Sequence, residues 1–240
     1  MDSATLDAAR ARLEDVRNDI ARTAEVAGRK AADVTLVAVS KTKDAADIQP
    51  LIAAGQRVFG ENRVQEAQGK WPALQERHPG ILLHMVGQLQ SNKAEEAVAL
   101  FDAIHGLDRS SLVGALARAM DKVGRRPDCF IQVNIGDEPQ KGGIAVTELP
   151  SLLAEARDAD LPVAGLMCVP PADVEAAPYF ALLAKLARDN GVTGLSMGMS
   201  QDYETAVMLG ATHVRVGTAL FGARPKQLGP GEIQIRWRQD

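Results

Sequence analysis

The sequence predicts an α/β protein, a single TIM-like (β/α)8 barrel with an extra N-terminal helix. Short apolar runs alternate with stretches of helical periodicity along almost the whole chain, which is typical of parallel strands joined by right-handed crossovers. Eight such runs are present, and eight strands close this kind of barrel. The length of 240 residues suits one barrel, so residues 1–240 are predicted to form a single domain. A doubly wound open sheet with fewer strands is the alternative.

The first predicted element is the N-terminal helix that precedes the barrel. Ser3 is its candidate N-cap, and Gly28 is its candidate C-terminal stop. Apolar residues recur at spacings of three and four, which places them on one helix face. These residues are Leu6, Ala9, Leu13, Val16 and Ile20.

The eight predicted strands follow as short apolar runs. They cover residues 34–39, 57–60, 81–86, 103–106, 130–135, 163–169, 194–197 and 213–217. Helical patterns lie between them, for example at residues 44–54, 61–77, 110–122, 146–159, 174–190 and 201–209. The tail after Gly222 is rich in Pro, Gly and Gln, and we expect it to pack on the outside.

Composition and charge disfavour several classes of protein. The net charge of -4 comes without a basic stripe, so we expect no nucleic-acid partner. There is no apolar run long enough for a transmembrane helix and no signal-peptide pattern, so we expect no membrane association. Cys129 and Cys168 lack framework spacing, which indicates a reduced, cytoplasmic protein. The four histidines are scattered, and we predict no metal site.

Lys41 is the first candidate functional residue, because functional groups in such a barrel follow the carboxyl ends of strands. It shares one strand face with Val37 and Val39, so it points into the barrel mouth if the valines fill the interior. A partly desolvated amine there is a better nucleophile, as a Schiff-base lysine requires. Taken alone, the segment favours the alternative of a surface lysine at a strand end.

Three further loops at the same end carry polar candidates. Asn62 could offer its side-chain amide to a ligand or cap the helix that follows, and its sequence favours neither. His84 precedes the loop after the third strand, where its imidazole could lie against a planar ring or be a satisfied core histidine. Lys141 could meet a phosphate or a carboxylate, although a solvated loop is the more usual arrangement.

The ends of the last two strands predict a phosphate site, which barrels often build there. Ser200 is a predicted helix N-cap, and the neighbouring amides would face an anion. Gly217 lets a phosphate approach the backbone, and Thr218 adds a hydroxyl. Arg215 can also point inward, where a buried cation needs a partner. A phosphate, a pyridine nitrogen or, alternatively, a strand-end acid would serve.

Five segments together resemble the pyridoxal phosphate homeostasis proteins. They are AVSKTK at 38–43, FGEN at 59–62, HMVGQLQSNK at 84–93, LSMGMS at 195–200 and VRVGT at 214–218. Their order and spacing match that family across nearly the whole chain. The family is similar in fold to the barrel domain of alanine racemase and of bacterial-type ornithine decarboxylases. The resemblance implies pyridoxal 5'-phosphate (PLP) as the cofactor and a role in vitamin B6 homeostasis, as a carrier or buffer rather than a catalyst.

The resemblance also implies roles for individual residues. Lys41 would form the internal aldimine with the cofactor, and Arg215 would face the pyridine nitrogen. The phosphate would be held by Ser200, Gly217 and Thr218.

Other parts of the pocket follow from the same resemblance. Asn62 would lie near the ring, where His84 is a further candidate, and Met199 would line the pocket. Arg63 stands where many relatives have Tyr after the Gly-Glu-Asn turn, so the resemblance does not define the rim of the pocket at this position. PLP-dependent apoenzymes are candidate recipients, and we expect a monomer.

Two arguments favour a carrier over a catalyst. Arg215 cannot accept the proton of the pyridine nitrogen, so the cofactor would be a poorer electron sink, which disfavours transamination but does not exclude racemisation. Racemases of this fold take a tyrosine base from a second domain, which we expect to be absent here, and the chain's tyrosines are Tyr179 and Tyr203. The alternatives are a PLP-dependent amino-acid racemase with weak activity and a Schiff-base aldolase or phosphosugar barrel without PLP.

Overall fold

The strands of the protein form one closed barrel. The computed structural model describes residues 2–222, and within them eight parallel strands pair in sequence order until β8 meets β1. The strands are β1 (Thr35–Val39), β2 (Val58–Glu61), β3 (Leu82–Met85), β4 (Ala103–Leu107), β5 (Asp128–Gln132), β6 (Val163–Met167), β7 (Gly194–Ser196) and β8 (His213–Val216). The predicted barrel is therefore confirmed, whereas the tail after Gly222 lies outside the described residues.

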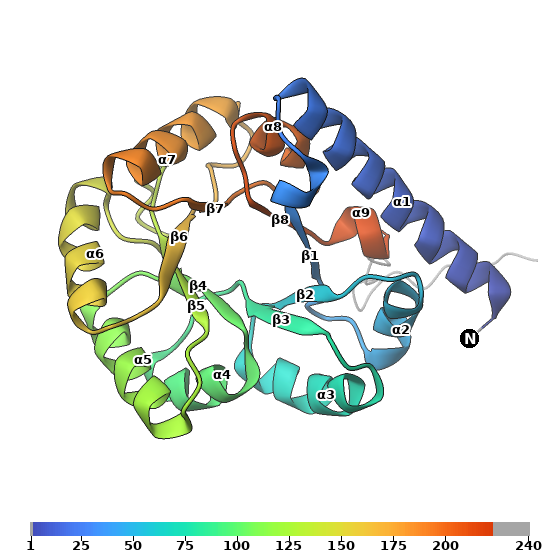
Figure 1. Ribbon diagram of the computed structural model, residues 1–240, viewed down its shortest axis with the longest axis horizontal. Coiled ribbons are helices and arrows are strands. Elements are labelled where there is room, and N and C mark those ends of the chain that lie inside the picture. Colours follow the sequence, from blue (N-terminus) through green and yellow to red (C-terminus); the bar gives the residue numbers. More distant parts are fainter. Residues whose placement is uncertain (1, 223–240) are drawn as a thin grey trace, which may run out of the picture.

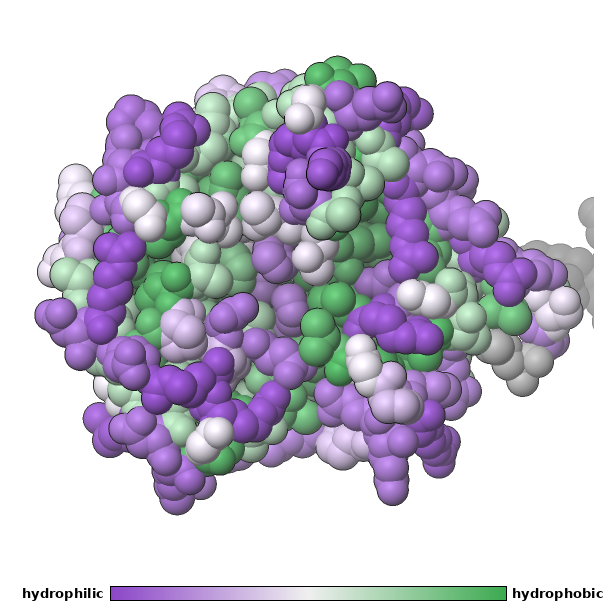
Figure 2. Space-filling model, in the orientation of Figure 1, coloured by the Kyte–Doolittle hydropathy of each residue, from purple (hydrophilic) through white to green (hydrophobic). Residues whose placement is uncertain are grey.

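Helices surround the barrel on its outer face, as Figure 1 shows. They are α1 (Ser3–Val26), α2 (Ala45–Ala53), α3 (Val64–Arg77), α4 (Ala94–Leu100), α5 (Ser110–Val123), α6 (Leu149–Asp158), α7 (Ala177–Asp189), α8 (Tyr203–Met208) and α9 (Thr218–Phe221). α1 packs against α2, α8 and α9. It thus covers the sector of the barrel where, as far as Gly222, β8 is followed by the four-residue α9. In the same orientation, Figure 2 shows hydrophilic side chains around the rim and more apolar ones towards the middle.

The predicted N-terminal helix is present, and its apolar stripe faces the barrel. Ala9, Leu13, Val16 and Ile20 are all buried. The N-cap is Asp2 rather than Ser3, because the Asp2 carboxylate accepts the Thr5 amide hydrogen at 2.7 Å. No helix in the described part of the chain is both long and apolar enough to cross a membrane.

One helix was not predicted, and several element boundaries differ from the sequence-based expectation, of which two have a clear physical reason. α4 was not among the predicted helices, since it has only seven residues and a short 3-10 turn leads into it. β5 begins two residues earlier than predicted, at the exposed Asp128, because pairing with β4 and not side-chain hydrophobicity defines its start. α3 begins at Val64 rather than at residue 61, because Glu61 is the last residue of β2.

The two faces of the barrel strands differ in chemistry. Outward-facing apolar residues such as Ala38, Phe59 and Leu83 belong to the core shared with the helices. The inner face instead carries glycines and polar groups together with a few apolar side chains. A side chain on Gly165 would meet the Gly194 carbonyl oxygen at 2.0 Å, so β6 and β7 pack this closely only because glycine stands there. The barrel therefore encloses a tightly packed, partly polar interior beneath the carboxyl ends of the strands.

Candidate cofactor site

Lys41 lies in the turn between β1 and α2, at the carboxyl end of the barrel. It is exposed, so the expected partial desolvation of its amine is not found. The next residue, Thr42, has a φ of 65°, a left-handed conformation that ends the strand sharply. A Cβ on Gly217 would lie 3.3 Å from the Val39 carbonyl oxygen and 3.7 Å from the Val39 Cβ. Lys41 therefore follows β1 immediately beside the end of β8.

The loops after β7 and β8 are joined through Ser200. Its hydroxyl oxygen accepts the Gly217 amide hydrogen at 3.3 Å and the Ala219 amide hydrogen at 3.4 Å. Ser200 is not the N-cap that the sequence predicts, because α8 begins after Asp202, whose carboxylate accepts the Met199 amide hydrogen at 2.6 Å. The serine thus connects the two loops from which the phosphate site was predicted.

Several backbone donors in these loops are available to a ligand. The amides of Ser200, Gln201 and Thr218 have no hydrogen-bond acceptor among residues 2–222. Gly198 has a φ of 95°, and a Cβ there would lie 2.5 Å from the Ala206 Cβ. Only glycine lets β7 turn this close to α8. Unpaired amides at the start of a helix favour an anion, so the geometry suits a phosphate.

Arg215 is buried on the inner face of β8, with 5% of its surface exposed. Its guanidinium donates to the Ser196 hydroxyl at 2.7 Å and to the Cys168 carbonyl at 2.9 Å. Within the described residues these partners are neutral, and the strand-end acid considered from the sequence is not among them. Burial lowers the pKa of Arg215. A guanidinium has five donors, so this cation retains capacity for a further acceptor at the mouth.

His84 belongs to a cluster of three histidines inside the barrel. Its Nδ1 lies 3.1 Å from Nε2 of His105, and Nδ1 of His105 lies 2.7 Å from the Ser196 hydroxyl. The ring of His213 is 5.9 Å from that of His84 and 5.8 Å from that of His105. His84 is thus a satisfied interior histidine that is coupled to Arg215 through Ser196. Its contact with a cofactor ring stays a prediction.

Burial governs the protonation of these imidazoles. It lowers the pKa of His84 to about 3, with a smaller effect from His213. Burial likewise lowers the pKa of His213 to about 4, with Arg215 adding to the effect. The pKa of His105 is also well below its usual range, chiefly because of burial. All three rings are therefore neutral at physiological pH.

The remaining predicted residues lie around the rim. Asn62 is half-buried, and its side-chain amide makes no hydrogen bond within residues 2–222. It does not cap α3, because Arg63 holds that position. Met199 is 39% exposed. Lys141 is not solvated as a free loop lysine, since its ammonium donates to the Pro170 carbonyl at 2.8 Å and pairs with Glu138.

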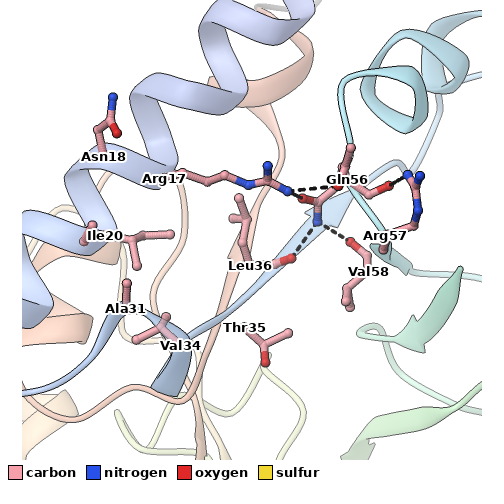
Figure 3. Close-up of a pocket in the computed structure, with 12 residues that line it drawn as sticks. Arg17, Asn18, Ile20, Ala31, Val34, Thr35, Leu36, Gln56, Arg57 and Val58 are labelled. Carbon is pink, nitrogen blue, oxygen red and sulfur yellow. Dashed lines mark hydrogen bonds between the residues drawn. The ribbon is translucent and has the colours of Figure 1, made fainter. Parts of the chain in front are cut away.

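A separate groove of about 510 Å³ lies between α1 and the amino-terminal ends of β1 and β2 (Figure 3). Its polar side chains bind the protein itself. Gln56 donates to the Leu36 and Val58 carbonyls, both at 2.7 Å, and Arg17 donates to the Gln56 side-chain oxygen at 3.2 Å. The groove therefore serves the packing of α1 against the strands. Among the described residues there is also no group of three or more His, Cys, Asp or Glu side chains arranged to hold a metal.

The comparisons with known proteins agree with this geometry. Residues 12–225 match the family described as alanine racemase, N-terminal domain. Fold and site therefore define a barrel of the alanine racemase N-terminal class. The chain is 40% identical over 224 residues to the pyridoxal phosphate homeostasis protein of Escherichia coli K12, covering 88% of this chain and 95% of the relative. The relative of the same name from Pseudomonas aeruginosa PAO1 is 41% identical over 212 residues, covering 85% and 91%. The chain belongs to the pyridoxal phosphate homeostasis protein family.

Solved structures extend the comparison. PipY of Synechococcus elongatus PCC7942, solved with PLP bound, has a TM-score of 0.77 and 38% identity, covering 89% of this chain and all of PipY. Alanine racemase of Clostridium difficile 630 has a TM-score of 0.68 at 15% identity, covering 92% of this chain and 58% of the racemase. The latter likeness is one of fold alone. The names of the two bacterial relatives describe homeostasis of the cofactor and not an enzymatic reaction.

Residues missed at the level of sequence are His105, His213, Ser196 and the buried pair of Glu61 and Lys70. Strand alternation places single side chains on the inner face, but nothing in the sequence indicates which of them meet across the barrel. The pairing of Glu61 with Lys70 joins a strand end to the second turn of a helix. Its nine-residue spacing fits no local motif.

Proposed function

We propose that this protein binds PLP as a Schiff base on Lys41 and acts in PLP homeostasis inside the cell, as a carrier or buffer of the cofactor. The observation that carries the proposal is that Lys41 follows the end of β1, where Val39 contacts Gly217, and that the loops after β7 and β8 present a set of unpaired amides. PipY, which has the same fold at 38% identity, supports the choice of cofactor. PLP supplies an aldehyde that condenses with an amine.

Each part of the site fits one part of that cofactor. The amides of Ser200, Gln201 and Thr218 suit the phosphate, because they present hydrogen-bond donors at helix starts without a competing acceptor. Arg215 suits the pyridine nitrogen, since an arginine donates and cannot take up a proton. Lys41 is exposed, so water and incoming amines can reach it. Access of this kind favours release and transfer over retention.

The direct test is chemical fixation of the adduct. We expect borohydride treatment of the PLP-loaded protein to leave a reduced pyridoxyl group on the peptide that contains Lys41, located by mass spectrometry. Pyridoxamine 5'-phosphate, which has the phosphate but no aldehyde, is the matched control and should leave no label. A label spread evenly over the lysines, or no label, would contradict the proposal.

A variant of Ser200 tests the proposed phosphate cradle, which is the set of amides of Ser200, Gln201 and Thr218 beside Gly217, separately from the lysine. Ser200→Asp puts a carboxylate among the amides, and its repulsion of the phosphate is expected to weaken PLP binding by about tenfold or more. Pyridoxal, which lacks the phosphate, should bind as it does to the wild type. Titration of both aldehydes by absorbance provides the comparison. Equal weakening for PLP and pyridoxal would argue against a phosphate at this position.

The alternative function is a PLP-dependent amino-acid racemase with weak activity, which the alanine racemase fold suggests. Within residues 2–222, Tyr203, which follows the loop after β7, does not present its hydroxyl to the mouth as an acid–base group. The Tyr203 hydroxyl donates to the Asp19 carboxylate of α1 at 2.8 Å, on the outside of the barrel, and burial raises the pKa of Tyr203. Absence of one acid–base group lowers a rate by about 10²–10⁴-fold.

Exchange of the substrate Cα hydrogen distinguishes the two functions. When the PLP-loaded protein is incubated with L-alanine or L-serine in deuterated water, we expect no more deuterium at Cα than free PLP alone introduces. The measurement is proton NMR of the amino acid over time. Incorporation at an enzymatic rate would favour the racemase.

A further inference from the structure

Lys70 is a buried cation behind the turn that carries Lys41. It lies on α3, and 9% of its side chain is exposed. Its ammonium donates to the Ser40 carbonyl at 2.9 Å and to the Lys43 carbonyl at 2.8 Å. These two carbonyls flank the turn on either side of Lys41. A single ammonium group thus connects both ends of the turn to the helix.

Two carboxylates hold the Lys70 ammonium in place. Oε1 of Glu61 lies 2.8 Å from it and Oε1 of Glu66 lies 3.0 Å from it. Glu61 is fully buried, and the same Oε1 also accepts the Ser40 hydroxyl at 2.6 Å and the Trp71 indole N–H at 2.9 Å. Its Oε2 has no hydrogen-bond partner in the described part of the chain. Lys70 is therefore the countercharge of a buried carboxylate as well as a donor to the turn.

The turn itself is fixed by its backbone. The Thr42 amide donates to the Glu66 carboxylate at 2.5 Å, and the Lys43 amide donates to the Ser40 carbonyl at 3.0 Å. Thr42 adopts the left-handed conformation, which an ordinary residue keeps only where its surroundings enforce it. The backbone at Lys41 is thus held firmly, whereas the Lys41 side chain is exposed.

We propose that Glu66 and Lys70 are positioning residues that hold the turn from Ser40 to Lys43, so that the Lys41 amine stays beside the cradle formed with Gly217. This inference rests on the proposed function, because it concerns the same lysine. Neither residue touches the cradle in the structure. Both act through the backbone: Glu66 through the Thr42 amide and Lys70 through the Ser40 and Lys43 carbonyls. A fixed backbone lowers the entropy lost when the amine is captured.

Glu66→Ala is the first test, because it removes the acceptor of the Thr42 amide without leaving a buried charge unpaired. We expect hydrogen exchange at the Thr42 amide of the cofactor-free protein to accelerate by about tenfold, the effect of one hydrogen bond to a charged group. The apparent PLP affinity, followed by absorbance, should weaken by a similar factor. Gln65→Ala, an exposed neighbour on the same helix, is the matched control and should change neither quantity.

Lys70 needs a double variant, because Lys70→Met alone would leave the Glu61 carboxylate buried without a cation. Lys70→Met combined with Glu61→Gln removes both charges while a side-chain oxygen remains to accept from Trp71. We expect this protein to fold, as judged by circular dichroism, to bind PLP at least about tenfold more weakly, and to exchange its Thr42 and Lys43 amides faster.

The outcomes separate this inference from the proposed function. If the wild type carries the label on Lys41 and both variants bind PLP as it does, the positioning role is overturned and the function stands. Faster amide exchange with unchanged PLP affinity would identify a purely structural contact and would equally overturn it. If the wild type gives no label on Lys41, the proposed function fails, and the inference fails with it.

Discussion

Lys41→Ala is expected to abolish covalent binding of PLP while the barrel remains folded. Lys41 is exposed, and its ammonium makes no hydrogen bond or ion pair among residues 2–222, so truncation should change the free energy of unfolding by less than about 0.5 kcal/mol. The loss of the amine removes the only nucleophile we assign to the site. The absorbance of the Schiff base should be absent, and borohydride should leave no label.

Lys43→Ala is the matched control, since Lys43 is in the same turn. Its ammonium lies 5.9 Å from the centre of the Phe221 ring, a contact of small energy between two half-buried residues. This variant should retain the label and the Schiff-base spectrum. A Lys41→Ala protein whose spectrum on addition of PLP equals that of the wild type would refute the assignment of Lys41.

Acid is expected to destabilise the protein steeply as the pH falls from about 6.5 towards 4, because of the three histidines inside the barrel. The folded protein holds their pKa values far below the usual 6.5, so in this range the unfolded chain binds protons that the folded one does not. The contribution of the neutral histidines to the free energy of unfolding is therefore complete above pH 6.5 and is lost as the pH drops. Each histidine contributes about 1.4 kcal/mol per pH unit, which gives up to about 4 kcal/mol per unit for all three.

Urea unfolding at several pH values measures this dependence. His213→Phe should lower the slope by about one third, because one proton-binding group is removed and a ring next to Phe130 is kept. A free energy of unfolding that is flat between pH 6.5 and 4.5 would show that the imidazoles titrate freely in the folded state.

The sequence was sufficient for the fold because each strand and most helices have their own period of hydrophobicity. The phosphate site at Gly217 and Thr218 stays a prediction, which rests on the tendency of barrels to bind phosphate after the last two strands. The environment of Lys41 could not, because its exposure depends on the left-handed Thr42 and on a helix residue far from the strand. Ser200 was misassigned as a cap because Asp202, two residues on, competes for the same role.

The cluster of three histidines shows a second reason why parts of the site could not be predicted from the sequence. His84, His105 and His213 come from three different strands, and each taken alone is one polar residue in an apolar run. They meet only because the order of the strands and the shift in register between neighbouring strands place them at the same height in the barrel. A single sequence does not specify this shift. Contacts such as that of Lys70 with the Ser40 carbonyl cannot be predicted for the same reason, since they depend on where a helix crosses a strand end.

The packing of α1 has a consequence for biosynthesis. α1 leaves the ribosome before any strand, yet its partners α8 and α9 are among the later elements: Arg12 donates to the Leu220 carbonyl, 208 positions along the chain. Until β8 and the helices beside it emerge, α1 lacks its contacts with α8 and α9, and one edge of β1 has no partner strand. The barrel therefore closes late, through contacts between residues far apart in the sequence. Until then, part of the apolar face of α1 is exposed on the nascent chain, where it can aggregate.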